Sequence, residues 1–218
     1  MAAAATQRTP VLSSRPTRNV VTALGLVLAL VAMFFSTKIV SPTEEAKLNP
    51  PPFNGATYAA AEFPKQAAKI GEKAVDLGTL IPAVAADLKA AGAQYGVDSG
   101  SGNYTFPVKF TATVTGVDEN FITLQSPVKG VRVLIPRGVA VSGTPVRDAL
   151  GDITFGDFVD QTDFQAVANE FKLLIERTIL GPANAASLEG KTVSVVGAWT
   201  TGGAPNTFII QPVKLEVR

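Results

Sequence analysis

The chain of 218 residues contains no histidine and no cysteine. These absences exclude cysteine and histidine nucleophiles, histidine acid–base catalysis, thiolate zinc sites and disulfide bonds. A chain without free thiols is compatible with an oxidising compartment. Phosphate-binding glycine motifs are also missing, since Gly202-Gly203 and Gly100-Ser101-Gly102 lack the lysine and the helix start that such motifs need. The composition therefore favours a protein that is not an enzyme and needs no cofactor.

Acidic residues are missing from the first 38 positions, and charged residues of either sign are missing from residues 19–37. A helix rises about 1.5 Å per residue, so such a run spans roughly the 30 Å hydrocarbon core of a bilayer. Arg8, Arg15 and Arg18 precede the run, and basic residues stay on the cytoplasmic side. We expect a cytoplasmic basic tail at 1–18 and a single-pass signal anchor at 19–37 in the inner membrane. The rest of the chain would then lie in the periplasm or outside the cell.

A cleaved signal peptide is the competing interpretation of this run. The apolar stretch is long for a signal peptide, and Phe34-Phe35 stands where cleavage would require small residues. No cysteine follows the run, so lipid cannot be attached to a lipobox. We therefore expect the segment to stay uncleaved and to anchor the protein in the membrane.

The charge balance changes when the amino-terminal segment is set aside. Removing Arg8, Arg15, Arg18 and Lys38 from the 19 basic residues leaves 15, against 18 acidic ones. A net acidic domain is a poor candidate for nucleic-acid binding, which depends on neutralising phosphates. We expect no nucleic-acid partner.

Composition divides the remaining chain into a linker and a domain. Residues 38–55 form a proline-rich linker, because consecutive prolines favour an extended, semi-rigid spacer. Residues 56–218 form the extracytoplasmic domain, whose first part, 56–96, has helical periodicity. Gly78 and Pro82 indicate two helices there, with Thr79 as a candidate N-cap.

Alternating strand patterns dominate the second part of the domain, residues 104–218. Three strands are predicted around 108–116, 121–125 and 131–135, then a helix at 161–180, and then strands at 192–199 and 208–217. Three strands, a helix and two strands is the element order of a five-stranded OB-like β-barrel with an inserted helix, although other α+β sheets use the same order. The predicted fold class is α+β, with a transmembrane helix, a helical segment and this barrel.

The most distinctive part of the sequence lies between the third strand and the helix. It consists of Gly143-Thr144-Pro145-Val146-Arg147-Asp148-Ala149-Leu150 and Phe155-Gly156-Asp157-Phe158-Val159-Asp160-Gln161. This segment resembles the G-T-x-x-R-D-A and F-x-D-F-x-N-Q signature of an uncharacterised family of predicted bacterial periplasmic lipoproteins. Members are often encoded beside ribose-type ABC sugar transporters, which implies possible ABC transporter partners but no chemistry. This chain departs from the pattern at Asp160, where the family carries asparagine.

Six residues of this segment form the candidate cluster: Thr144, Arg147, Asp148, Asp157, Asp160 and Gln161. In a structural interpretation, Thr144 caps a short helix and Arg147 pairs with a nearby carboxylate. In a functional interpretation, Arg147 presents its planar fork to an anionic or hydroxyl-rich ligand, and Asp148 orients it. Asp160 also fits a cap at the start of the long helix. The sequence leaves these alternatives open.

The carboxylates and aromatic residues suggest other functions. The spacing of the aspartates between 148 and 163 fits no EF-hand, so no metal site is predicted. Two carboxylates can serve glycoside hydrolysis, and Trp199, Phe155 and Phe158 can contact sugars. Trp199 is expected at the core or rim, while Phe155 and Phe158 are expected to anchor the motif onto the helix. Our hypothesis is an accessory component of a sugar ABC transport system, with a carboxylate-dependent glycosidase or a small-molecule (sugar) binding module as alternatives.

Overall fold

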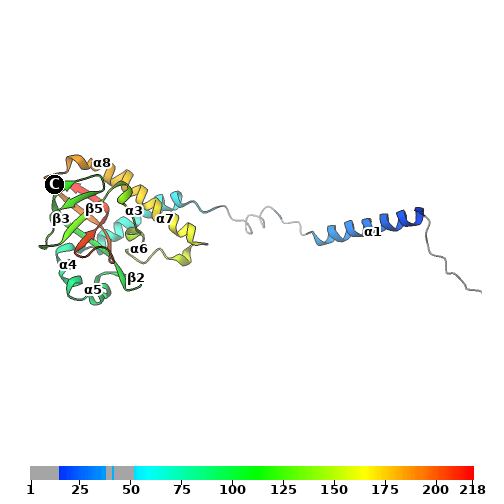
Figure 1. Ribbon diagram of the computed structural model, residues 1–218, viewed down its shortest axis with the longest axis horizontal. Helices are drawn as coiled ribbons and strands as arrows, with labels where there is room; N and C mark the ends of the chain where they lie inside the picture. The colour runs from blue at the N-terminus through cyan, green and yellow to red at the C-terminus, as the bar shows by residue number, and fades with distance from the viewer. Residues whose placement is uncertain (1–14, 38–40, 42–51) are drawn as a thin grey trace, which may run out of the picture. The chain divides into compact units, whose positions relative to one another are not determined.

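The computed structural model describes residues 15–37, 41 and 52–218, and the chain divides into two compact units, Met1–Pro52 and Phe53–Arg218. The first unit contains α1 (Arg15–Ser36; Figure 1). The apolar side chains from Val20 to Phe35 are exposed along this helix. Within the described residues, α1 is the one helix long and apolar enough to cross a membrane, and a signal sequence has the same properties. Most of the predicted basic tail and linker lies outside the described residues.

Three helices open the second unit: α3 (Gly55–Lys73), α4 (Leu77–Ala86) and α5 (Leu88–Tyr95). Each begins at a residue whose side-chain oxygen accepts a hydrogen bond from a backbone N–H of the first turn, as is usual at helix starts. These N-caps are Asn54, Asp76 and Asp87. The prediction of two helices with Thr79 as N-cap was wrong, because Asp76 accepts from the N–H of Gly78 and starts α4 earlier.

The second unit also contains a curled sheet. Its strands are β1 (Val75–Asp76), β2 (Val97–Gly100), β3 (Asn103–Val117), β4 (Phe121–Leu124), β5 (Arg132–Pro136), β6 (Thr192–Thr200), β7 (Thr207–Ile209) and β8 (Gln211–Val217). Neighbours pair in the order β7-β5-β4-β3-β6-β8, and both β1 and β2 pair with the long strand β3. β3 therefore holds most of the sheet together, and it pairs with β6 from Thr105–Thr200 to Thr113–Thr192.

The described sheet has eight strands rather than the predicted five. β1 and β2 were not predicted, because they are short and depend on β3 for pairing. The last predicted strand is divided at Ile210, whose N–H donates to the carbonyl of Leu134. Before that point β7 runs parallel to β5, and after it β8 runs antiparallel to β6. β7 and β8 are the two ends of the strand order, and they are adjacent in sequence. The sheet therefore curls back on itself.

Helices pack against the curled sheet and close the core. The long helix α7 (Gln161–Ile175) continues into a π-helical turn (Glu176–Leu180) and α8 (Gly181–Ala183), and it lies beside α3 (Figure 1). The rings of Phe63 on α3 and Phe171 on α7 meet at 5.4 Å between centroids. Shorter helical turns are η1 (Gly138–Ala140), α6 (Pro145–Asp148), η2 (Phe155–Asp157) and η4 (Ala185–Ser187). Full burial of each large apolar side chain here contributes about 1.5–3 kcal/mol.

Gly197 lies in β6 at a point where β8 leaves no room for a side chain. The pairing register of these strands shifts between Val196 and Gly197. A Cβ atom at position 197 would lie 2.3 Å from the carbonyl oxygen of Gln211 and 2.9 Å from Cγ2 of Ile210. The first of these atoms belongs to the backbone and cannot rotate away. A side chain at this position would therefore push the two strands apart.

We expect Gly197→Ala to lower the free energy of unfolding by about 1–3 kcal/mol, the usual cost of overpacking. Gly116→Ala in β3 is the matched control, since a Cβ there meets nothing within 4 Å and its backbone needs no positive φ. Urea unfolding followed by the fluorescence of the one tryptophan measures both changes. If Gly197→Ala and Gly116→Ala had equal free energies of unfolding, a side chain at position 197 would not strain the pairing of β6 and β8.

Candidate functional site

The distinctive segment begins with α6, which follows a left-handed turn at Gly143. Thr144 occupies the N-cap position that the structural interpretation predicted, and Pro145 lies in the first turn. The Thr144 hydroxyl, however, makes no capping bond to the backbone and instead donates to Oδ2 of Asp148 at 2.5 Å. Thr144 therefore holds a carboxylate in place rather than closing the helix.

Arg147 is the centre of this cluster and is only 6% exposed. Its Nε donates to Oδ1 of Asp148 at 2.7 Å, and its Nη1 donates to the carbonyl of Phe164 on α7 at 3.2 Å. The guanidinium carbon lies 3.6 Å from the centroid of the Phe164 ring, a close cation–π contact. These contacts are all internal and join α6 to α7, so they favour the structural interpretation of Arg147.

The other three candidate residues lie apart from this group. The Asp157 carboxylate accepts hydrogen bonds from the backbone N–H and the hydroxyl of Thr154, and these bonds lower the pKa of Asp157. Asp160 caps α7 by accepting from the N–H of Asp163 at 3.0 Å, which confirms the predicted cap. Gln161 is exposed at the first residue of α7. Within the described residues, no hydrogen bond links these three side chains to Arg147.

The two phenylalanines of the motif pack against α7, as predicted. Phe155 and Phe158 lie 6.0 and 5.6 Å from the Phe164 ring, measured between centroids. Phe158 also meets Phe53 and Tyr58, each at 5.4 Å, where the domain begins. Phe164 is therefore shared between the guanidinium of Arg147 and the aromatic residues of the second half of the motif.

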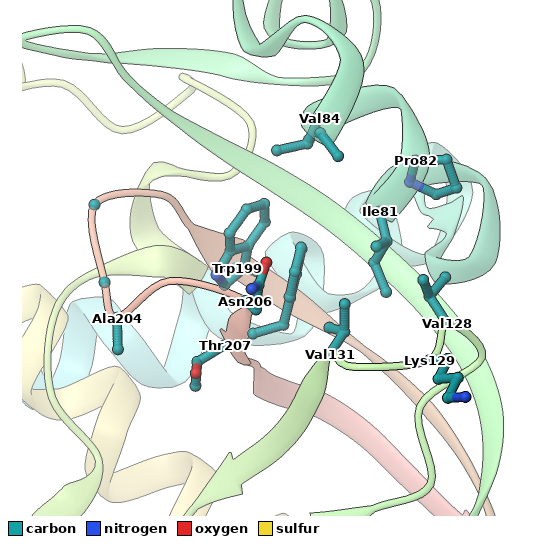
Figure 2. A pocket seen from close by; sticks show the side chains of 14 residues that line it. Ile81, Pro82, Val84, Val128, Lys129, Val131, Trp199, Ala204, Asn206 and Thr207 are labelled. Atoms are coloured by element: carbon teal, nitrogen blue, oxygen red, sulfur yellow. The ribbon is translucent and has the colours of Figure 1, made fainter.

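A pocket of about 420 Å³ forms a second candidate site, called here the Trp199 pocket (Figure 2). It lies between α4, the loop from β4 to β5 and the loop from β6 to β7. Its lining consists of Ile81, Pro82, Val84, Ala85, Val128, Lys129, Val131, Trp199, Gly202, Gly203, Ala204, Asn206, Thr207 and Phe208. Lys129 is the one charged residue of this set, so the pocket is mainly apolar.

Trp199 is buried at the pocket, and two other aromatic rings pack against its indole. Phe208 lies 4.1 Å from it between centroids and tilted by 33°, while Phe106 lies at 5.6 Å and nearly parallel, at 18°. In Figure 2 the indole lies among the lining side chains, below Val84 and beside Asn206. The expectation that Trp199 sits at the core or rim is confirmed, since it is 7% exposed and lines the pocket.

Residues 27–216 match the model of a protein family described as "predicted periplasmic lipoprotein (DUF2291)". The chain belongs to this family. Membership makes the protein a predicted periplasmic lipoprotein of unknown function and fits a membrane-associated, extracytoplasmic location. The chain has no cysteine to carry a lipid, so among the described residues the candidate for membrane association is the apolar helix α1.

A solved OB-fold protein from Thermotoga maritima shares the fold of this DUF2291 member. The two chains are 15% identical and superpose with a TM-score of 0.63, over 77% of this chain and all of the other. This likeness supports an α+β, OB-like architecture despite the different strand count. No curated protein matches the chain.

The sequence pointed to the motif but missed the pocket. Of the lining residues, only Trp199 was predicted as a sugar contact, because the lining comes from segments far apart in the chain. The glycine pair Gly202-Gly203 was the one further signal, since a turn without side chains leaves space beside an aromatic residue. No group of three acidic side chains in the described residues is placed to hold a metal ion.

We expect Arg147→Ala to lower the free energy of unfolding by about 2–4 kcal/mol, because Asp148 loses its partner and Phe164 its cation. The lower end of this range applies because the Asp148 side chain is 23% exposed, so water reduces the cost of losing its partner. Lys69→Ala is the control, because it also removes a cation from an aspartate, Asp152, but in an exposed pair. That change should have little effect.

Thermal and urea unfolding measure both variants. Arg147→Ala unfolding at the same midpoint as the unaltered protein would contradict a structural role. Failure of the same variant in a transport assay would then support the functional interpretation of Arg147.

Proposed function

We propose that this protein is a membrane-anchored extracytoplasmic module that binds without catalysing a reaction and acts as an accessory component of a sugar ABC transport system. The observation that carries the binding role is the Trp199 pocket, whose volume lies in the usual range for small-molecule sites. The pocket includes the loop between β6 and β7. In OB folds with five strands, the loop between strands four and five contributes to binding.

The side chains of the pocket support binding rather than catalysis. None of the lining residues is an acid, and Lys129 is the one titratable group among them. The carboxylates near the motif are held by local partners: Asp148 by Arg147, Asp152 by Lys69 and Asp157 by Thr154. Glycoside hydrolysis requires two carboxyl groups that face a sugar from either side of the scissile bond. We therefore do not extend the proposal to a glycosidase.

The anchored topology rests on the sequence of the amino-terminal segment. α1 is long and apolar enough to span a bilayer, and the basic residues Arg8, Arg15 and Arg18 come before or at its start. These features support a single pass with the amino terminus in the cytoplasm and the domain outside. The link to sugar transport is supported by the resemblance of residues 143–161 to proteins encoded beside ribose-type transporters.

The absence of cysteine allows a direct test of topology. Glu119→Cys, on the exposed turn between β3 and β4, should react in spheroplasts with a membrane-impermeant maleimide. Ser13→Cys, in the predicted cytoplasmic tail, should react only after the membrane is permeabilised. Reaction at position 13 in intact spheroplasts would reverse the proposed orientation. A product that lacks residue 13 would show cleavage of the anchor.

Uptake of radiolabelled ribose tests the accessory role. Deletion of the gene should lower uptake severalfold, and the full chain should restore it. A chain carrying Leu24→Arg and Leu28→Arg should not restore uptake, because two charges at the centre of α1 prevent membrane insertion. Uptake of an unrelated amino acid is the control and should stay constant. Unchanged ribose uptake in the deletion strain would show that the transport role is wrong.

A further inference from the structure

The lining of the Trp199 pocket selects the chemistry of its ligand. We propose that the pocket binds the acyl chain of a free fatty acid, with the carboxylate placed beside Lys129 at the rim. This inference rests on the proposed function in one respect only, that the module binds through this pocket. It does not require a sugar as the ligand.

Aliphatic side chains from two segments line the pocket. Ile81 and Val84 come from α4, while Val128 and Val131 come from the loop between β4 and β5. Figure 2 shows Ile81 and Val131 pointing toward each other on one side of the pocket. A sugar placed here would lose water from its hydroxyl groups and find few partners, which is unfavourable. An acyl chain has no polar groups to satisfy.

The position of Trp199 argues in the same direction. Sugar rings stack on the open face of an aromatic ring, but Phe208 and Phe106 lie against the indole at 4.1 and 5.6 Å. Trp199 is also only 7% exposed, so little of the ring is free for a sugar to stack on. A methylene chain gains from burial against any apolar surface and needs no open aromatic face.

Lys129 supplies the preference for an anion. It is exposed, it is the one charged residue of the lining, and no ion pair involves it within the described residues. A carboxylate at the end of a buried chain would lie beside an ammonium group that stays in water. Because such exposed pairs are weak, the charge should change affinity by only about twofold to fivefold.

The proposed anchor makes this ligand accessible. The chain passes from a helix able to span a bilayer to Phe53, the start of the domain, within a short stretch of residues. Tethering to a surface where amphiphiles collect raises their effective concentration at the pocket. A modest affinity is then sufficient for occupancy.

Photo-crosslinking of the full chain in native membranes tests the proposal. The probe is a diazirine analogue of lauric acid, and the readout is the labelled tryptic peptides. We expect labelling of Ala74–Lys89 and Thr192–Lys214, which carry the α4 and β6–β7 parts of the lining. Asn19–Lys38, from the apolar helix, should also be labelled and provides an internal reference for probe in the bilayer.

Variants separate the pocket from general adsorption. Val84→Asp should lower labelling of the two pocket peptides severalfold relative to Asn19–Lys38. Because Val84 is half-buried, Ala204→Asp at the exposed rim provides a second variant that leaves the core intact. Lys129→Met should lower labelling about twofold to fivefold. Lys109→Met, an exposed lysine outside the lining, is the control and should have no effect.

The uncharged diazirine lauramide tests the role of the carboxylate. It should label the pocket less than the acid does, and the difference should disappear in Lys129→Met. Labelling confined to Asn19–Lys38, or equal labelling by acid and amide, would overturn the proposal. Labelling of the pocket peptides by a photoreactive ribose instead would overturn the ligand class and leave the binding module intact. The ribose uptake assay reports separately on the transport role.

Discussion

The guanidinium of Arg147 is a buried cation, so it places strict demands on the residues around it. An uncompensated buried charge costs several kcal/mol, and each N–H of the guanidinium needs an acceptor. Asp148 supplies the countercharge, Thr144 holds Asp148, and the carbonyl and ring of Phe164 occupy the remaining side. The short helix α6 and the long helix α7 are thereby fixed to each other. In this chain, Thr144, Arg147 and Asp148 of the G-T-x-x-R-D-A segment all take part in this arrangement.

The strands and the long helix could be predicted because their patterns are local. Alternation along 108–116 marks β3, and the apolar face beginning at Phe164 marks α7. The cap at Asp160 was also predictable, since it depends only on the short segment from Asp160 to Asp163. The break at Ile210 was not, because it arises when one strand changes partner from β5 to β6. That change depends on the curvature of the whole sheet, which no short window of sequence contains.

The candidate sites differ in the same way. Arg147 and Asp148 are adjacent in sequence, so their pairing was among the sequence-based alternatives, although the role of Phe164 as the second partner was not. The Trp199 pocket brings together residues near 81, 128 and 204, and its shape depends on small residues such as Gly202 that leave space rather than fill it. Empty space has no sequence pattern of its own. A sequence can therefore indicate which side chains require partners more readily than where the fold leaves a cavity.

The motif and the pocket are connected through β6. α6 packs against β6 and β8, and β6 ends at Trp199 and Thr200 on the side of the pocket. Loss of the Arg147 contacts would free α6 and remove support from the same strand that positions the indole. Changes at the exposed rim, such as those at Lys129 or Ala204, touch neither α6 nor α7 and should combine additively with changes in the cluster. A coupling energy between Arg147 and the rim would then mean that β6 itself has two positions, since packed elements transmit an effect only when they have discrete alternatives. In that case the arrangement around the buried Arg147 would also set the shape of the pocket.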